Sequence, residues 1–293
     1  TMEQDNTVKN GITGTGIFVS GDAGNSVLRN DIDELKELKE MNVNKIPNPG
    51  SLPVPEMLLH KAATRGKASH GWLESNQTFS FADYYNPERM HFGVLRVLND
   101  DWIAPGMGFG RHPHDNMEII SIPLEGALEH SDSMNNIAVI QKGDIQVMSA
   151  GTGIFHTEYN KHTDKPVSFL QIWLFPREKN VTPRYDQRSL NSSDRHNTFQ
   201  QILSPDKEDE AVWVNQDAWF HMGNFDRDMS AVYKLKKTGN GVYAFIIKGE
   251  VSIEGRLLGE RDGLGIWNTE TISVKTGLQG AEILLMEVPM AIS

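Results

Sequence analysis

The stretch GFGRHPHDNMEIIS, residues 108–121, carries His112 and His114 two positions apart, with Glu118 four residues further along. The Met and Ile residues around Glu118 indicate a β-strand. Side chains at positions i and i+2 of a strand point to the same side of the sheet. The two imidazoles are therefore expected to converge on one point, which is an arrangement that suits a metal ion.

A second pair of this kind lies in GTGIFHTEYN, residues 151–160, where His156 and Glu158 are again two positions apart. Two neighbouring strands of a barrel can bring both pairs to one interior point. Three imidazoles and a carboxylate suit a divalent transition metal such as iron, copper, nickel, manganese or zinc. Spacing alone does not decide between Glu158 and Glu118 as the carboxylate. The candidate ligands are His112, His114 and His156, together with Glu158 or Glu118.

The composition of the chain limits the classes of function. Of its 293 residues, 38% are hydrophobic, which is enough for a sizeable core. The net charge of −11 disfavours binding of nucleic acid through a basic face. The chain has no cysteine, which excludes disulfides, thiolate ligands and cysteine nucleophiles.

Membrane and targeting segments are not visible in the sequence. The apolar stretch FLQIWLF, residues 169–175, includes Gln171 and is far shorter than the roughly 18 residues of a membrane span. The opening residues TMEQDNTVKN lack a basic segment followed by an apolar run. We therefore expect a cytoplasmic protein that does not insert into a membrane.

Residues 1–56 differ in texture from the rest of the chain. NDIDELKELKEM, residues 30–41, predicts one short helix capped by Asn30 or Asp31. The segment that follows contains four prolines and predicts an extended linker. We expect residues 1–56 to form an N-terminal extension whose role the sequence does not reveal.

From Met57 onward, short apolar runs are separated by Gly, Asn, Asp and Pro, which predicts an all-β sandwich or barrel. SIPLEGALEHSD, residues 121–132, resembles FIIKGEVSIEGR, residues 245–256, and this echo predicts duplication of one β-unit. After residue 188 the histidines, His196 and His221, are isolated. We therefore predict a metal-binding domain over residues 57–188 and a metal-free domain over residues 189–293.

Two segments resemble the paired motifs of the cupins: GMGFGRHPHDNMEIISIPLEG (106–126) and GDIQVMSAGTGIFHTEYN (143–160). Three further segments, HGWLESNQTFSFADYYNP (70–87), EHSDSMNN (129–136) and LQIWLFP (170–176), match the pattern of one cupin family. The chain thus resembles the pirin family of bicupins, in particular its bacterial quercetinase-like members. The resemblance runs from about residue 57 to the end of the chain and is strongest up to Arg188. It implies two tandem cupin barrels of the jelly-roll kind.

The resemblance also implies a ligand set. In pirins the fourth ligand is the glutamate two residues after the last histidine, here Glu158. Glu118 then supports either the ligands or the fold. One divalent transition metal ion is expected, with iron favoured and copper, nickel, manganese and zinc as alternatives. The C-terminal cupin is expected to support the first one without binding metal.

The family implies two kinds of function. The first is dioxygenation of a flavonol such as quercetin, in which O₂ cleaves the ring, carbon monoxide is released and Glu158 takes the flavonol proton. The second is a non-enzymatic, metal-dependent regulator that acts through a protein partner. A dioxygenase with another phenolic or enolic substrate is a third alternative. We expect the enzyme, with a small aromatic substrate and O₂ and without direct contact to nucleic acid. Candidates to line its pocket are Phe109, Met117, Met148, Phe155 and Trp173, although ordinary core packing is the more common role for any single one of them.

Overall fold

The computed structural model describes residues 54–292. The predicted helix at residues 30–41 and most of the predicted linker lie outside this part of the chain. Within residues 54–292 there is no α-helix, and two 3₁₀ helices accompany twenty strands: η1 (Ala62–Thr64) and η2 (Ser192–Arg195). The predicted all-β fold class is confirmed.

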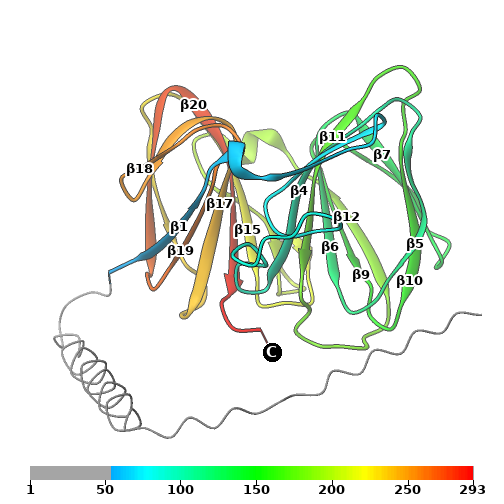
Figure 1. Cartoon of the computed structure of the whole chain (residues 1–293). Coiled ribbons are helices and arrows are strands. Elements are labelled where there is room, and N and C mark those ends of the chain that lie inside the picture. Colours follow the sequence, from blue (N-terminus) through cyan, green and yellow to red (C-terminus); the bar gives the residue numbers. More distant parts are fainter. Residues whose placement is uncertain (1–53, 293) are drawn as a thin grey trace, which may run out of the picture. The chain divides into compact units, whose positions relative to one another are not determined.

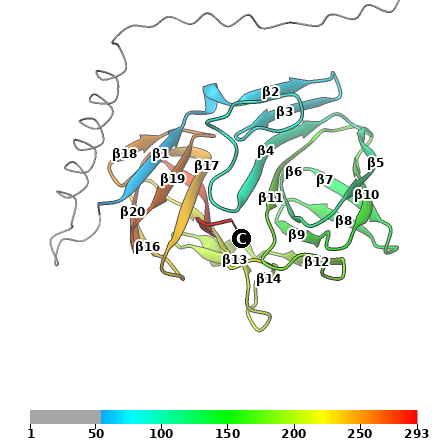
Figure 2. The same ribbon diagram turned by 60° about the horizontal axis from the view of Figure 1, so that its bottom comes forward.

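Two sheets form the first barrel, and Figure 2 shows them curving around a common interior. The seven-stranded sheet has the order β12 (Arg184–Ser189), β9 (Asp144–Ser149), β6 (Glu118–Glu125), β11 (Val167–Leu174), β4 (Leu95–Ile103), β3 (Leu73–Gln77), β2 (Gly66–Ser69). The four-stranded sheet has the order β5 (Gly108–His114), β10 (Ile154–Asn160), β7 (Ala127–Asp132), β8 (Ile137–Gln141).

The second barrel is built from one nine-stranded sheet (Figure 1). Its main order is β1 (Glu56–His60), β19 (Gly263–Trp267), β17 (Asn240–Ile253), β20 (Thr271–Pro289), β15 (Trp219–Phe225), β13 (Gln200–Ser204), β14 (Val212–Trp213). Two further strands pair with the long ones: β16 (Ser230–Lys234) with β20 and β18 (Arg256–Leu258) with β17. Both barrels of the predicted bicupin are present.

Strand β11 shows how alternation of side chains builds two different environments. Leu170, Ile172 and Leu174 are fully buried in a core that also contains Phe245 and Leu284 of the second barrel. Burial of each such side chain contributes roughly 1.5–3 kcal/mol. The residues that alternate with them line a pocket in the first barrel: Gln171 and Trp173. The large sheet of the first barrel is therefore covered on both faces, and the shared core joins the two barrels.

The first strand of the described chain corrects one detail of the predicted organisation. We expected the first domain to begin at Met57, but β1 pairs in antiparallel register with β19, from Glu56 opposite Trp267 to His60 opposite Gly263. An open sheet edge exposes unpaired backbone groups, and β1 covers this edge. By its hydrogen bonds β1 belongs to the second barrel, whereas the predicted division after residue 188 stays a prediction.

Candidate metal centre

The pairing of β10 with β5 brings three histidines together. His156 lies opposite His112, and Ile154 lies opposite His114. Paired residues point to the same side of the sheet, so the three imidazoles share one face. One nitrogen atom from each ring lies within 4.8 Å of the other two. In the described part of the chain this is the only group of three or more His, Cys, Asp or Glu residues so arranged.

A β-bulge in β5 determines that Phe109 also lies on the face that carries the histidines. The register between β10 and β5 shifts between His156 and Glu158, so that Glu158 lies opposite Phe109. Strict alternation along β5 would put Phe109 on the face away from His112. The extra residue in β5 reverses this, as bulges commonly do beside functional sites. Phe109 therefore lines the same pocket as His112 and Glu158.

The hydrogen bonds of the imidazoles leave nitrogen atoms free to bind a metal. His112 Nδ1 is 2.7 Å from the carbonyl oxygen of Gly110 and donates to it, which leaves the lone pair on Nε2. That Nε2 atom is 2.9 Å from Nε2 of His156. Nε2 of His114 is buried and has no hydrogen-bond partner within residues 54–292. Three converging imidazoles with an unpaired buried nitrogen fit a divalent transition metal.

The environment also favours the neutral form of two of the rings. Burial, together with the neighbouring His112 and His130, lowers the pKa of His156 to about 3. Burial and the other two imidazoles lower the pKa of His114 to about 4. Imidazole binds metal only when it is neutral, so these two side chains need not lose a proton to bind a metal at neutral pH.

Glu158 is buried beside the histidine group, with 1% of its surface exposed. Gln171 donates from Nε2 to its Oε2 at 3.0 Å, and the hydroxyl of Ser121 donates to its Oε1 at 3.4 Å. Trp173 in turn donates from Nε1 to Oε1 of Gln171 at 3.2 Å. The group of ligand atoms that lie within 4.8 Å of one another consists of the three imidazole nitrogens and does not include a carboxylate oxygen of Glu158. This carboxylate is held in place by side chains of β6 and β11, which belong to the other sheet of the barrel.

Glu118 contacts a different part of the molecule. Its Oε2 accepts hydrogen bonds from the hydroxyl of Ser149 at 2.8 Å and from the backbone N–H of Asn215 at 3.1 Å. Burial raises the pKa of Glu118 to about 7 against the effect of these hydrogen bonds. Glu118 and Ser121 are an odd number of positions apart on β6, so Glu118 faces away from the side on which Ser121 contacts Glu158. Glu118 therefore connects the first barrel to the Asn215 loop of the second.

A further histidine of the first barrel, His130, packs beside the group of three histidines. His130 is fully buried, its ring centroid is 5.4 Å from that of His156, and its Nε2 is 2.9 Å from Oδ2 of Asp132. The ring of Tyr185 packs against His130 with centroids 4.7 Å apart. Sequence reasoning did not single out these residues, although EHSDSMNN contains His130 and Asp132. Their H-x-D spacing was the available signal.

A pocket of about 380 Å³ opens beside the histidines, within the usual range for small molecules. Of the five expected lining residues, Phe109 and Trp173 line it. The other three candidates do not line it. Met117 and Met148 belong to an apolar cluster against which Trp173 also packs, which matches the alternative of ordinary core, and Phe155 is 41% exposed on the outer surface.

Two aromatic residues of the lining were missed by sequence reasoning. Trp72 and Phe81 lie outside the named strands, where no alternation of side chains marks them. Trp72 pairs edge-to-face with Phe109, and Phe81 pairs in the same way with Trp173. These four rings make one part of the pocket aromatic.

Another part of the lining is polar and buried. This polar wall consists of side chains from β3, β4, β10 and β11: Ser75, Gln77, Asn99, Asp101, Glu158 and Gln171. Burial, opposed by a hydrogen bond from Ser75 and assisted by the negative charges of Asp100 and Glu158, raises the pKa of Asp101 to about 7. The pocket thus combines aromatic rings, the polar wall and the histidine group.

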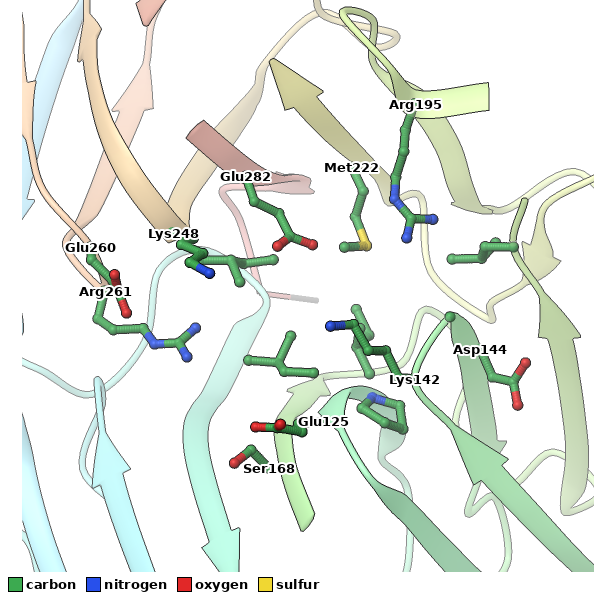
Figure 3. Close-up of a pocket in the computed structure, with 16 residues that line it drawn as sticks. Glu125, Lys142, Asp144, Ser168, Arg195, Met222, Lys248, Glu260, Arg261 and Glu282 are labelled. Carbon is green, nitrogen blue, oxygen red and sulfur yellow. The ribbon is translucent and has the colours of Figure 1, made fainter. Parts of the chain in front are cut away.

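Another cavity, of about 300 Å³, lies where the two barrels meet. Figure 3 shows Arg195, Lys142 and Glu282 pointing into it from different elements. Charges of both signs line this cavity, and the histidine group lies elsewhere. The pocket beside His112 is therefore the candidate reaction site.

Two family models match separate parts of the chain. The Pirin model matches residues 59–174, and the model of the quercetinase C-terminal cupin domain matches residues 201–288. Quercetin 2,3-dioxygenase of Escherichia coli is 43% identical over 231 residues, which cover 79% of this chain and 98% of that relative. The chain belongs to the pirin family. A pirin-like protein of Caulobacter vibrioides is 39% identical over 223 residues, which cover 76% of this chain and 95% of that relative.

Solved pirin structures have the same fold. The crystal structure of YhhW from Escherichia coli superposes with a TM-score of 0.76 at 41% identity, and the match covers 81% of this chain and all of that one. A second structure of bacterial pirin YhhW is a complex with nickel(II). Among the described residues of the present chain, no helix is long and apolar enough to cross a membrane.

Proposed function

We propose that this member of the pirin family is a metal-dependent dioxygenase that cleaves a flavonol such as quercetin with O₂. The observation that carries the proposal is the convergence of three imidazoles beside an aromatic pocket of about 380 Å³. Relatives named quercetin 2,3-dioxygenase support it. The proposed ligands are His112, His114, His156 and Glu158, and the proposed ion is iron, with nickel as the first alternative because of the complex of YhhW.

The ion contributes one property to the reaction. A bound divalent metal lowers the pKa of a hydroxyl group beside it and thereby favours the flavonolate. The protein's part is to receive the proton and to hold the substrate in a dry site.

Glu158 is the proposed proton acceptor. Gln171 holds its Oε2 and Ser121 approaches its Oε1, so the carboxylate is fixed before the substrate arrives. A positioned base of this kind commonly contributes about 10²–10⁴-fold to the rate. The same carboxylate then returns the proton to the ring-opened product.

The aromatic part of the pocket is proposed to orient the flavonol and to exclude water. Trp72 packs edge-to-face against Phe109 with ring centroids 5.5 Å apart, and Phe81 packs likewise against Trp173 at 5.3 Å. Such walls favour planar aromatic ligands. Both oxygen atoms of O₂ enter the products, one ring carbon leaves as carbon monoxide, and no other reductant is required.

The test is an O₂-uptake assay with the purified full-length chain, loaded separately with iron(II) and nickel(II). We expect one O₂ consumed and one carbon monoxide released per quercetin. Metal-stripped protein and free metal at equal concentration are the controls. Loaded protein that is inert toward quercetin and toward other enolisable phenols would contradict the proposal and favour a regulator that acts through a protein partner.

A further inference from the structure

The polar wall of the pocket contains buried oxygen atoms that the protein itself does not satisfy. Gln77, Asn99 and Asp101 are between 2% and 4% exposed. The atoms Oε1 of Gln77, Oδ1 of Asn99 and Oδ1 of Asp101 have no hydrogen-bond partner in the part of the chain that the structure describes. An unpaired buried polar group is costly, so three of them in one wall call for an explanation.

The strand register places these groups side by side. Gln77 lies opposite Asn99, and Ser75 lies opposite Asp101, on the neighbouring strands β3 and β4. Asn99 also lies opposite Gln171 of β11, which holds Glu158. The wall therefore runs across three strands, which is about 10 Å at the usual spacing of strands in a sheet. It begins at the proposed proton acceptor and continues away from it.

The chemistry of the wall defines what it can bind. Carboxylate and amide oxygens accept hydrogen bonds, and the amides of Gln77 and Asn99 can also donate through their nitrogen atoms. Phenolic hydroxyl groups both donate and accept. A single phenol ring is too short to reach along about 10 Å of wall, whereas a fused or linked ring system with hydroxyl groups on the ring remote from the metal matches it.

We infer that Gln77, Asn99 and Asp101 form a recognition subsite for ring hydroxyl groups, so that the pocket selects polyhydroxylated, multi-ring phenols. This inference rests on the proposed function, because that proposal places the reacting group at the histidines. It adds that substrates are distinguished at a second place, by hydroxyl groups that take no part in the reaction.

Two compounds separate the subsite from the reacting centre. Quercetin carries ring hydroxyl groups in addition to its 3-hydroxyl, and 3-hydroxyflavone carries the 3-hydroxyl alone. Binding is measured by isothermal titration calorimetry to the nickel(II)-loaded full-length chain without oxygen, so that no turnover is needed. We expect the wild type to bind quercetin about ten- to a hundredfold more tightly than 3-hydroxyflavone, because the polar groups of the wall stay unpaired in the complex with the compound that lacks the additional ring hydroxyls.

The variant Asn99→Leu removes the hydrogen-bonding groups at similar size. We expect it to lose about tenfold or more in quercetin affinity, with 3-hydroxyflavone affinity unchanged. Asn76→Leu is the matched control, because Asn76 lies on β3 between Ser75 and Gln77 and is absent from the pocket lining. Gln77→Met provides a second test should Asn99→Leu fail to fold.

The Tm of Asn99→Leu distinguishes a role of Asn99 in ligand binding from a purely structural role. Replacing an unsatisfied buried amide with an apolar side chain removes a desolvation penalty, so the Tm of Asn99→Leu is expected to equal or exceed that of the wild type. Equal loss of both compounds, or no loss of either, overturns the inference and assigns the oxygens to ordered water. Discrimination that depends on Asn99 without any turnover of quercetin would keep the subsite and reject the dioxygenase instead.

Discussion

The two barrels are filled in opposite ways. Interior positions of the second barrel carry mainly apolar side chains, such as the fully buried Val242, Ala244 and Ile246 of β17, and its buried polar groups include His221 and Glu287. The pocket side of the first barrel carries histidine, carboxylate and amide groups on β3, β4, β5, β10 and β11 instead. Both patterns obey the same alternation of side chains along strands. The same fold therefore accommodates either polar or apolar side chains in the interior of its barrel.

The polar interior of the first barrel has a cost that the core between the barrels offsets. Unpaired polar atoms of the pocket wall such as Asn99 Oδ1 and Gln77 Oε1, which lack a partner among residues 54–292, destabilise the first barrel. The shared core consists of hydrophobic side chains, to which β11 contributes Leu170, Ile172 and Leu174. Through this core the second barrel supplies stability to the barrel that carries the candidate site.

The largest expected effect comes from removing one of the three histidines. His156→Ala deletes a proposed ligand, so we expect metal content to fall to background and quercetin turnover to be lost. His221→Ala is the matched control, because His221 is a buried histidine of the second barrel with 4% of its surface exposed. Metal analysis of both purified variants is the measurement, and equal metal content in His156→Ala and the wild type would contradict the ligand assignment.

Glu158→Gln is expected to have the next largest effect. The variant keeps the size of the side chain and an oxygen atom but cannot accept a proton as a carboxylate does. We expect kcat for quercetin to fall by about 10²–10⁴ while the three histidines retain the metal. Unchanged kcat at full metal occupancy would remove Glu158 from the proposed role of base.

A substitution in the filled interior of the second barrel is expected to change stability and to leave metal content and kcat unchanged. Ile246 is fully buried there, and Ile246→Ala is expected to lower the free energy of unfolding by about 2–5 kcal/mol. The metal content and the kcat of the folded fraction should not change. Ile137→Ala, at a position that is 75% exposed in the first barrel, is the control and should cost less than about 0.5 kcal/mol. A kcat that falls with Ile246→Ala would show that the second barrel takes part in the reaction.

Glu118 tests the connection between the barrels through pH. Its pKa is raised to about 7 in the folded state, mainly by burial, from an ordinary value of 4.5. The folded state therefore holds this proton more tightly, and the resulting stability is present below pH 4.5 and lost as the pH rises through about 7. Relative to Glu118→Gln, the wild type should lose up to about 3 kcal/mol over this window. A free energy of unfolding that changes in parallel for the two proteins from about pH 5 to pH 8 would contradict this interpretation.

The sequence predicted the local part of the candidate site well. The spacings of His112 with His114 and of His156 with Glu158 were enough to expect one face of two strands, and the structure brings the three imidazoles within 4.8 Å. Alternation within a strand is a local property, so one sequence suffices for it. The ligand roles themselves stay a prediction.

The parts that escaped prediction depend on distant pairings. The bulge that turns Phe109 toward Glu158 is set by the register between β5 and β10. The polar wall depends on β3 lying beside β4, and the position of β1 depends on an open edge that is distant in the chain. A pattern within one segment contains no information on such partners. Phe155 was misassigned for a simpler reason, because it alternates with His156 and so faces outward.

The most direct test of the account is the position of the metal in crystals of the full-length chain, grown with iron(II) or nickel(II) and measured at the absorption edge of the ion. We expect one anomalous peak per chain, among His112, His114 and His156 and within coordination distance of Glu158. A peak inside the second barrel, or a peak in the first barrel that these histidines do not touch, would contradict the claim that the two barrels divide reaction and support between them.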